Sequence, residues 1–354
     1  MGKLRTRSAG ILAVLLVWMV GVETAAACAA WESFKSRFVS ENGRVIDTAN
    51  GDISHSEGQG YGLLLAAAYE DAGAFARLFA WTHANLMIRS DGLLVWQYKP
   101  GDQRFPDANS ASDGDVLVAF ALLVAGEKFD NARYTRLGRE LAGRVRETLV
   151  REVGGYTVLL PGPEGFVRDD GSVVINLSYW VFPALTRFTE LPGGDTWQAL
   201  AADGRRLLRK ARFGTWDLPP DWAVLRPDGS VHLPDGDAFE PVFGYNAVRI
   251  PLYLAWADGA ARDDLLRPFR AFWSQTATPD SIPLVVDLAR NDIRDRGANP
   301  GFEAIRALVA RERRGPSGGA ATAGERGTHY YDAVLALLAC EAAADGGSAC
   351  ACGN

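Results

Sequence analysis

Apolar residues recur three or four positions apart along most of the chain, which is the spacing of amphipathic helices. Several of these segments follow a Ser, Asp, Asn or Gly, residue types that commonly begin a helix. We therefore predict a predominantly helical protein. The predicted helices span Ala29–Phe38, Gly60–Asp71, Ala72–Met87, Asp113–Gly126, Asn131–Val150, Ser178–Thr189, Gly194–Ala211, Gly244–Trp256, Arg262–Thr276, Phe302–Ala310 and Thr328–Ala343.

Short stretches of strand-like composition lie between these helices. They are Leu93–Tyr98, Gly155–Leu160, Ser230–Leu233 and Leu284–Asp287. The regular alternation of strand and helix that builds a doubly wound sheet is missing, so paired helices in an α/α toroid fit the pattern better. The segment 311–327 is rich in Arg, Gly, Ser and Ala. We interpret it as a surface loop within one domain, because the helix predicted after it is apolar.

The N-terminal segment has the pattern of an export signal. Basic residues at positions 3, 5 and 7 precede the apolar core Ile11–Val22, and three alanines follow at 25–27. The apolar core is too short to span a membrane comfortably. We predict a signal peptide over residues 1–27, a single mature domain over 28–354, and a periplasmic or secreted protein. Acylation of Cys28, as in a lipoprotein, stays open as an alternative.

Composition narrows the class of partner. Hydrophobic residues make up 48% of the chain, enough for a large core, and the net charge is −6 with no basic stripe, which argues against nucleic acid as a partner. The four cysteines are Cys28, Cys340, Cys350 and Cys352; Cys28 could pair with a cysteine near the C-terminus. The four histidines show no metal-ligand spacing. We expect no metal, no other cofactor and a monomer.

Two acids stand where polar segments give way to apolar runs. Glu57 lies among small residues just before Leu63–Tyr69, and Asp113 precedes Val116–Ala125. Both acids are thus predicted at the start of a helix. A pair of carboxyl groups placed in this way is typical of glycoside cleavage, in which one acid protonates the leaving oxygen.

The segments that carry these acids, Ser56–Gly62 and Asn109–Asp115, resemble the two acidic motifs of glycoside hydrolase family 8. Further matching segments run along nearly the whole mature chain; they are Glu41–Asp47, Leu159–Gly162 with Gly165–Phe166, Asn176–Tyr179, Pro220–Trp222, Gly244–Pro251 and Tyr330–Tyr331. The resemblance implies an (α/α)6 barrel whose open groove binds a β-1,4-glucan such as cellulose and cleaves it with inversion. It also implies a functional link to a bacterial cellulose synthase complex.

The resemblance assigns roles to individual residues. Glu57 matches the general acid that protonates the leaving glycosidic oxygen. Asp113 matches the second acid, which contacts the distorted sugar at the cleavage point and either stabilises charge there or helps to hold the water. Asp115 is expected to cap or support this segment, and Arg249 to orient neighbouring acids.

One position departs from the pattern of the cellulose-degrading members. Their catalytic base is an Asp, and Asn246 stands in its place. An amide can orient a water molecule but has no useful basicity, whereas inverting hydrolysis needs a base. Three readings follow: a relocated base, a glucan-binding protein that has lost turnover, or a related hydrolase acting on xylan or chitosan. For the relocated base the candidates are Asp235, Asp237, Glu240 and Asp113.

The class of protein and its sugar contacts complete the prediction. Toroids of this kind also host polysaccharide lyases, but a lyase for uronates would need a basic groove. Retention of Glu57, which is needed only for chemistry, favours a hydrolase. Aromatic rings can stack on the faces of a neutral sugar polymer. The residues predicted to bind substrate are Trp96, Tyr98, Tyr179, Trp222, Tyr245, Arg249 and Tyr330.

Overall fold

The computed structural model describes residues 28–101, 104–235, 238–257, 262–310 and 329–344. Helices dominate these residues, which confirms the predicted class. They comprise a helix over residues 28–38, α2 (Ser56–Ala68), α3 (Ala72–Asn85), α4 (Ser112–Lys128), α5 (Ala132–Leu149), α6 (Phe182–Phe188), α7 (Gly194–Lys210), α8 (Arg249–Trp256), α9 (Arg262–Thr276), α10 (Pro300–Ala310), α12 (Tyr330–Ala343) and a short 3₁₀ helix, η1 (Leu177–Tyr179).

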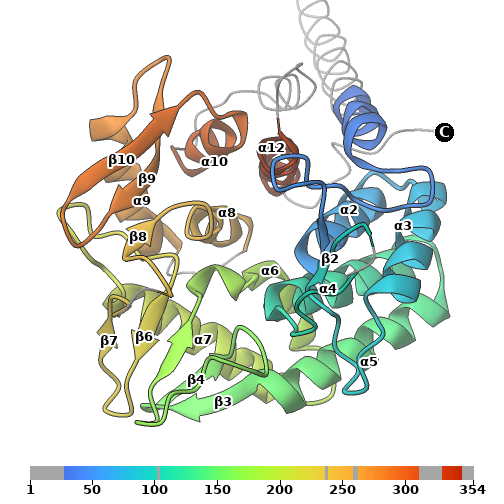
Figure 1. Cartoon of the computed structure of the whole chain (residues 1–354), viewed down its shortest axis with the longest axis horizontal. Coiled ribbons are helices and arrows are strands. Elements are labelled where there is room, and N and C mark those ends of the chain that lie inside the picture. Colours follow the sequence, from blue (N-terminus) through green and yellow to red (C-terminus); the bar gives the residue numbers. More distant parts are fainter. Residues whose placement is uncertain (1–27, 102–103, 236–237, 258–261, 311–328, 345–354) are drawn as a thin grey trace, which may run out of the picture.

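Alternate helices contact one another in a closed circuit. Helix α2 packs on α4, α4 on α6, α6 on α8, α8 on α10, α10 on α12, and α12 returns to α2. We call these six helices the inner ring. The intervening helices cover the ring from outside, with α3 on α2, α5 on α4, α7 on α6 and α9 on α8 (Figure 1). Helices in two layers therefore enclose the core.

The sequences of the helices explain which layer each one occupies. Helices α2, α4 and α12 are rich in Leu, Ala and Val on every side, and nearly all of their residues are buried. A helix that is apolar all round must be covered on all faces. Helices α5 and α7 instead bury one stripe and present Arg, Glu and Asp to solvent. The amphipathic helices therefore form the outer layer.

Short antiparallel strands occupy the connections between helices. Strand β1 (Ser54–His55) pairs with β2 (Gln97–Tyr98), and β3 (Val150–Val153) pairs with β4 (Tyr156–Leu159). Two three-stranded sheets have the orders β5-β6-β7 and β10-β9-β8. Their strands are β5 (Val173–Ile175), β6 (Ala223–Leu225), β7 (Val231–His232), β8 (Val242–Phe243), β9 (Ile282–Asp287) and β10 (Asp292–Gly297). Within the described residues no sheet closes on itself.

The structure moves several predicted boundaries. Helix α2 begins at Ser56, so Glu57 lies inside the helix and not before it. The helix predicted over Ser178–Thr189 is divided into η1 and α6, with a proline in the first turn of α6. The helix predicted from Gly244 begins at Arg249, because the backbone N–H groups of Gly244 and Ala247 donate to the Asp221 side chain and shape a turn. Strand β10 has no apolar alternation and was not predicted.

Several predicted features fall partly or wholly outside the described residues. These are the export signal over 1–27, the loop over 311–327, and Cys350 and Cys352. Cys28 is disulfide-bonded, and Cys340 is buried on α12. No helix among the described residues is long and apolar enough to cross a membrane.

Glycine sets the spacing between two inner-ring helices. A Cβ on Gly60 would lie 2.6 Å from the Cβ of Leu117 on α4. We expect Gly60→Ala to lower the free energy of unfolding by about 1–3 kcal/mol through overpacking. The control is Gly143→Ala on outer helix α5, where a Cβ would meet nothing within 4 Å. That change should raise the free energy of unfolding by about 0.5–1 kcal/mol, because alanine favours a helix. Urea denaturation measures both; equal effects would contradict the inner-ring packing.

Candidate active site

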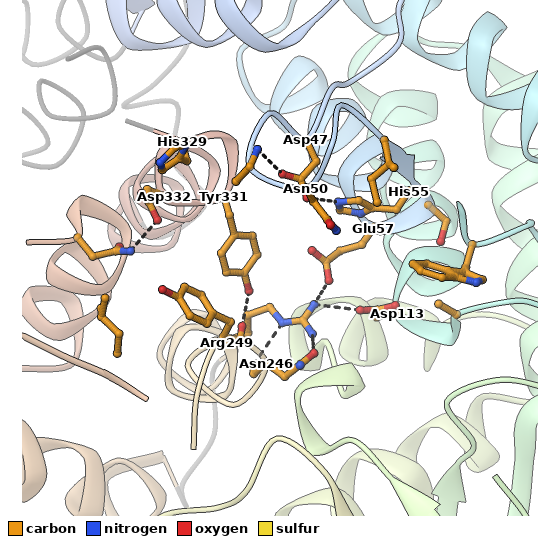
Figure 2. Close-up of a pocket in the computed structure, with 18 of the residues that line it drawn as sticks. Asp47, Asn50, His55, Glu57, Asp113, Asn246, Arg249, His329, Tyr331 and Asp332 are labelled. Carbon is orange, nitrogen blue, oxygen red and sulfur yellow. Dashed lines mark hydrogen bonds and ion pairs between the residues drawn. The ribbon is translucent and has the colours of Figure 1, made fainter. Parts of the chain in front are cut away.

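The N-terminal ends of the inner-ring helices surround a cavity of about 760 Å³. Glu57 and Asp113 lie in the first turns of α2 and α4, and Arg249 is the first residue of α8. Figure 2 shows these side chains pointing toward one another, with Tyr331 and Asp332 from the start of α12 on the other side. The positive end of a helix dipole favours a nearby carboxylate. Helix N-termini therefore support the acids of this cavity.

The guanidinium of Arg249 lies at the centre of the site and is 1% exposed. Its Nη1 contacts Glu57 and donates to Asp113 Oδ2 at 2.9 Å. Its Nη2 donates to Ser178 Oγ at 2.9 Å and to Asn246 Oδ1 at 2.8 Å. A buried cation is tolerated only when it is paired and hydrogen-bonded. Arg249 meets this condition through groups from α2, α4, η1 and the turn before α8.

Glu57 and Asp113 form a pair of interacting carboxyl groups, since one Arg249 nitrogen contacts both. Burial, and then the negative charge of Glu57, raises the pKa of Asp113 to about 7, although Arg249 acts in the opposite direction. Asp113 therefore keeps its proton at pH values where an ordinary aspartate is ionised. The Glu57 side chain is 16% exposed and that of Asp113 is 2% exposed. Glu57 is therefore the member that can reach a bound molecule.

Asn246 lines the cavity on the α8 side and is held in one orientation. Its Oδ1 accepts from Arg249 and, at 3.2 Å, from Asn176 Nδ2. Its side-chain amide also donates to Asp221, a buried acid whose pKa is raised by desolvation despite this bond and those of neighbouring backbone N–H groups. Because Arg249 has no acceptor, the oxygen of Asn246 must face it. Asn246 thus keeps the Arg249 network intact without contributing a negative charge.

The predicted substrate-binding residues are only partly brought together. Trp96, Tyr179, Tyr245 and Arg249 line the cavity. Tyr98 packs edge-on against Trp81 at 5.2 Å and does not line it. Trp222 does not line the cavity either. Its ring stacks on that of Phe166, with centroids 5.9 Å apart, and meets the ring of Tyr179, which does line the cavity.

Tyr330, predicted to bind substrate, does not line the cavity. It is 0% exposed and packs against Phe34 and Phe38 in the core. The next residue, Tyr331, lines the cavity instead, and its hydroxyl donates to the Tyr245 carbonyl at 2.6 Å. Adjacent residues at the start of a helix point in different directions, and the sequence could not tell which of the two tyrosines faced inward.

The two described acids of the loop upstream of Asn246 do not line the cavity. Asp235 is paired with Arg168, and Glu240 with Arg294, on exposed parts of the surface. Asp237 lies outside the described residues. Asp113 does line the cavity, but it lies beside Glu57 and not on the opposite side, where an inverting base acts. Asp47 and Asp332 are the other carboxyl groups among the lining residues.

Several lining residues had not been predicted. They are Asp47, Asn50, His55, Asn299, His329 and Asp332. Asp47 and His55 belong to or adjoin segments already singled out around the acidic motif, so proximity in sequence could have found them. Asp332 likewise follows directly on the matching segment Tyr330–Tyr331. Asn299, which donates to Asp332 at 2.6 Å, comes from a segment with no such signal. Among the described side chains, no group of three or more His, Cys, Asp or Glu is arranged to hold a metal ion.

Asp115 accepts two hydrogen bonds that hold the segment around Asp113 in place. It is fully buried, its Oδ1 accepts from the Leu94 N–H at 2.7 Å, and its Oδ2 accepts from the Ser110 hydroxyl. Burial raises the pKa of Asp115 to about 7 from an ordinary value of 3.8. Between these two values the folded protein keeps a proton that the unfolded chain releases. Asp115 therefore makes the protein less stable as pH rises through this window.

We expect Asp115→Asn to remove this pH dependence. The amide can still accept from Leu94 and can donate to Ser110, so the fold is kept. The free energy of unfolding of the wild type, relative to the variant, should fall by about 4 kcal/mol as pH rises from about 4 to above 7. Urea denaturation of both proteins at several pH values measures this. A difference that does not change with pH would contradict the prediction.

Comparisons with known proteins agree with this geometry. The family model described as "Glycosyl hydrolases family 8" matches residues 1–345. An endoglucanase of Cellulomonas uda is 38% identical over 301 residues, which are 85% of this chain and 81% of that protein. The crystal structure of endoglucanase Cel10 from Klebsiella pneumoniae has a TM-score of 0.82 at 35% identity and covers 90% of this chain and 99% of that one. The endo-β-1,4-glucanase CMCax from Acetobacter xylinum has a TM-score of 0.80 at 34% identity, covering 92% and 99%. The chain therefore belongs to glycosyl hydrolase family 8.

Proposed function

We propose that this glycoside hydrolase is an endo-β-1,4-glucanase that hydrolyses cellulose or a similar amorphous β-glucan with inversion. The observation that carries the proposal is the pair of carboxyls, Glu57 and Asp113, joined by buried Arg249 at the wall of an open cavity. The relatives named as endoglucanases support the substrate class. The closed circuit of six inner helices with an outer layer supports the finer description of the fold as an (α/α)6 barrel.

The substrate would lie across the cavity between α2 and α8. Trp96, Tyr179 and Tyr245 offer aromatic faces to the sugar rings, which binds a neutral polymer without charge pairing. Glu57 would donate its proton to the glycosidic oxygen as the bond from that oxygen to the anomeric carbon breaks. Asp113, deeper in the wall, would be ionised while Glu57 holds the proton, and its negative charge would face the positive charge that develops on the sugar. Arg249 keeps both acids in position throughout.

A water molecule must attack the anomeric carbon from the opposite face and lose a proton. Helix α8 lies across the inner ring from α2, so Asn246 is on the side from which that water would come. Its amide can orient the water but cannot accept the proton. We propose that a carboxyl elsewhere in the cavity accepts it. The competing reading, a glucan-binding protein without turnover, is weakened by the intact set of Glu57, Asp113 and Arg249.

The proposal extends to the place of action. The basic and apolar pattern of residues 1–27 supports export to the periplasm or beyond. The resemblance of the motifs to family members that accompany cellulose synthases supports a role beside such a complex. We propose that the mature protein acts there as a monomer on the β-glucan.

The decisive test is release of reducing ends from carboxymethylcellulose by the mature protein. We expect hydrolysis by the wild type and a loss of about 10²–10⁴-fold in kcat for Glu57→Gln, which keeps the shape of the acid but not its proton. Asn246→Asp serves as the paired variant. Wild-type activity that vanishes with Glu57→Gln would establish a hydrolase whose base lies away from position 246. An inactive wild type with activity gained in Asn246→Asp would instead indicate a glucan-binding protein that has lost its base.

A further inference from the structure

His55 caps the helix that carries Glu57. It ends β1 in an extended conformation, and its ring Nδ1 accepts from the backbone N–H of Gly58 at 3.0 Å. Glu57 lies between these two residues, inside the capped turn. Helix N-caps are usually oxygen atoms of Ser, Thr, Asp or Asn side chains. Here the cap is a ring nitrogen, which can be protonated near neutral pH.

Asp47 determines which ring nitrogen carries the proton. Because Nδ1 accepts a hydrogen bond, the proton of the neutral ring must be on Nε2. That atom lies 3.4 Å from Asp47 Oδ2, and the two side chains are only 14% and 13% exposed. Asp47 is itself held in a turn, through a bridge to Ile53 and a hydrogen bond of 3.2 Å from the Ala49 N–H. The ring is therefore fixed from both sides.

The capped turn has little room to move. The ring of Tyr330 meets His55 edge-on, with centroids 5.8 Å apart. A Cβ on Gly58 would lie 2.9 Å from the Tyr330 hydroxyl and 3.2 Å from His55 Cε1. Tyr330 of α12 therefore packs directly against the turn. The cap accepts from Gly58, which directly follows Glu57, so its loss would free the backbone next to this acid.

We propose that His55 and Asp47 form a positioning pair that holds Glu57 in place while the His55 ring is neutral, and that protonation of Nδ1 releases the first turn of α2. The inference rests on the proposed role of Glu57 as the acid. A protonated Nδ1 cannot accept from Gly58, so two N–H groups would then face each other.

Neighbouring acids raise the pKa of the His55 ring. The groups that face His55 are Asp47 from the preceding loop, Glu57 on its own helix, Asp113 from α4 and the neutral Tyr330 from α12. Burial has the largest effect and lowers the pKa of His55, but the hydrogen bond with Asp47 and the electrostatic effects of Glu57, Asp47 and Asp113 outweigh it. The pKa of His55 is therefore raised above its ordinary value. Loss of the cap would begin at a higher pH than for an isolated histidine.

The test compares the pH profiles of kcat and KM on a neutral, soluble cello-oligosaccharide for three variants. His55→Asn replaces the ring by a favoured N-cap that does not titrate. It should keep most of kcat at neutral pH and lose the decline on the acid side. His55→Ala removes the cap and should lower kcat by about tenfold or more at neutral pH, with little change in KM, because the acid is misplaced. Its difference from the wild type should shrink at acid pH, where the wild type also loses the cap. Asp47→Asn should move the acid-side decline to lower pH.

His83→Asn is the matched control, since His83 is exposed on α3 and does not line the cavity. It should have the wild-type profile. An acid-side decline that is unchanged in His55→Asn, or a wild-type kcat in His55→Ala, would overturn the positioning pair.

A second measurement does not depend on turnover. Nitrogen NMR of the histidine rings, with the His55 signal assigned by its loss in His55→Asn, should show Nε2 protonated and Nδ1 unprotonated at high pH. A proton on Nδ1 of the neutral ring would overturn the proposal even in an active enzyme. A wild type that does not hydrolyse glucan would overturn the proposed function alone, because the ring protonation still decides the positioning pair.

Discussion

The buried guanidinium of Arg249 is the interaction on which the rest of the site depends. A charge removed from water destabilises the fold unless acceptors surround it in good geometry. Here the acceptors are Glu57, Asp113, Ser178 and Asn246, which are far apart in the sequence. They meet only when the inner ring has closed. The ring and the site therefore form together, and the same contacts that satisfy Arg249 also align the two acids.

The ring explains why so much chemistry gathers at one end of the molecule. Alternate helices run in the inner layer, and their N-terminal ends share one mouth. Each end leaves backbone N–H groups without helical partners and presents the positive end of a dipole. Carboxyl groups are favoured in such a place, even where burial opposes their charge. Short strands lie in the connections that lead to these ends. Strand β1, for example, ends at His55, the residue that caps α2.

The charges around position 246 also explain why an amide side chain fits there. Arg249 brings one positive charge to the two acids that it contacts, Glu57 and Asp113. A third carboxylate at position 246 would add a charge next to buried Asp221, whereas the amide donates to Asp221 and accepts from Arg249. The amide of Asn246 thus keeps the two acids and Arg249 in position without adding a charge of its own.

The sequence by itself determined the helical class, the acidic motifs and the aromatic character of the cavity. These properties are local, because helical periodicity and short motifs are written in neighbouring residues. The sequence did not determine that Tyr331 and not Tyr330 faces the cavity, that Asp235 and Glu240 face away from it, or that Asn299 and Asp332 line it. Each of these depends on how distant helices are turned against one another. The same holds for the raised pKa of Asp113 and for the cap formed by His55, since burial and neighbouring charge exist only once the ring has closed.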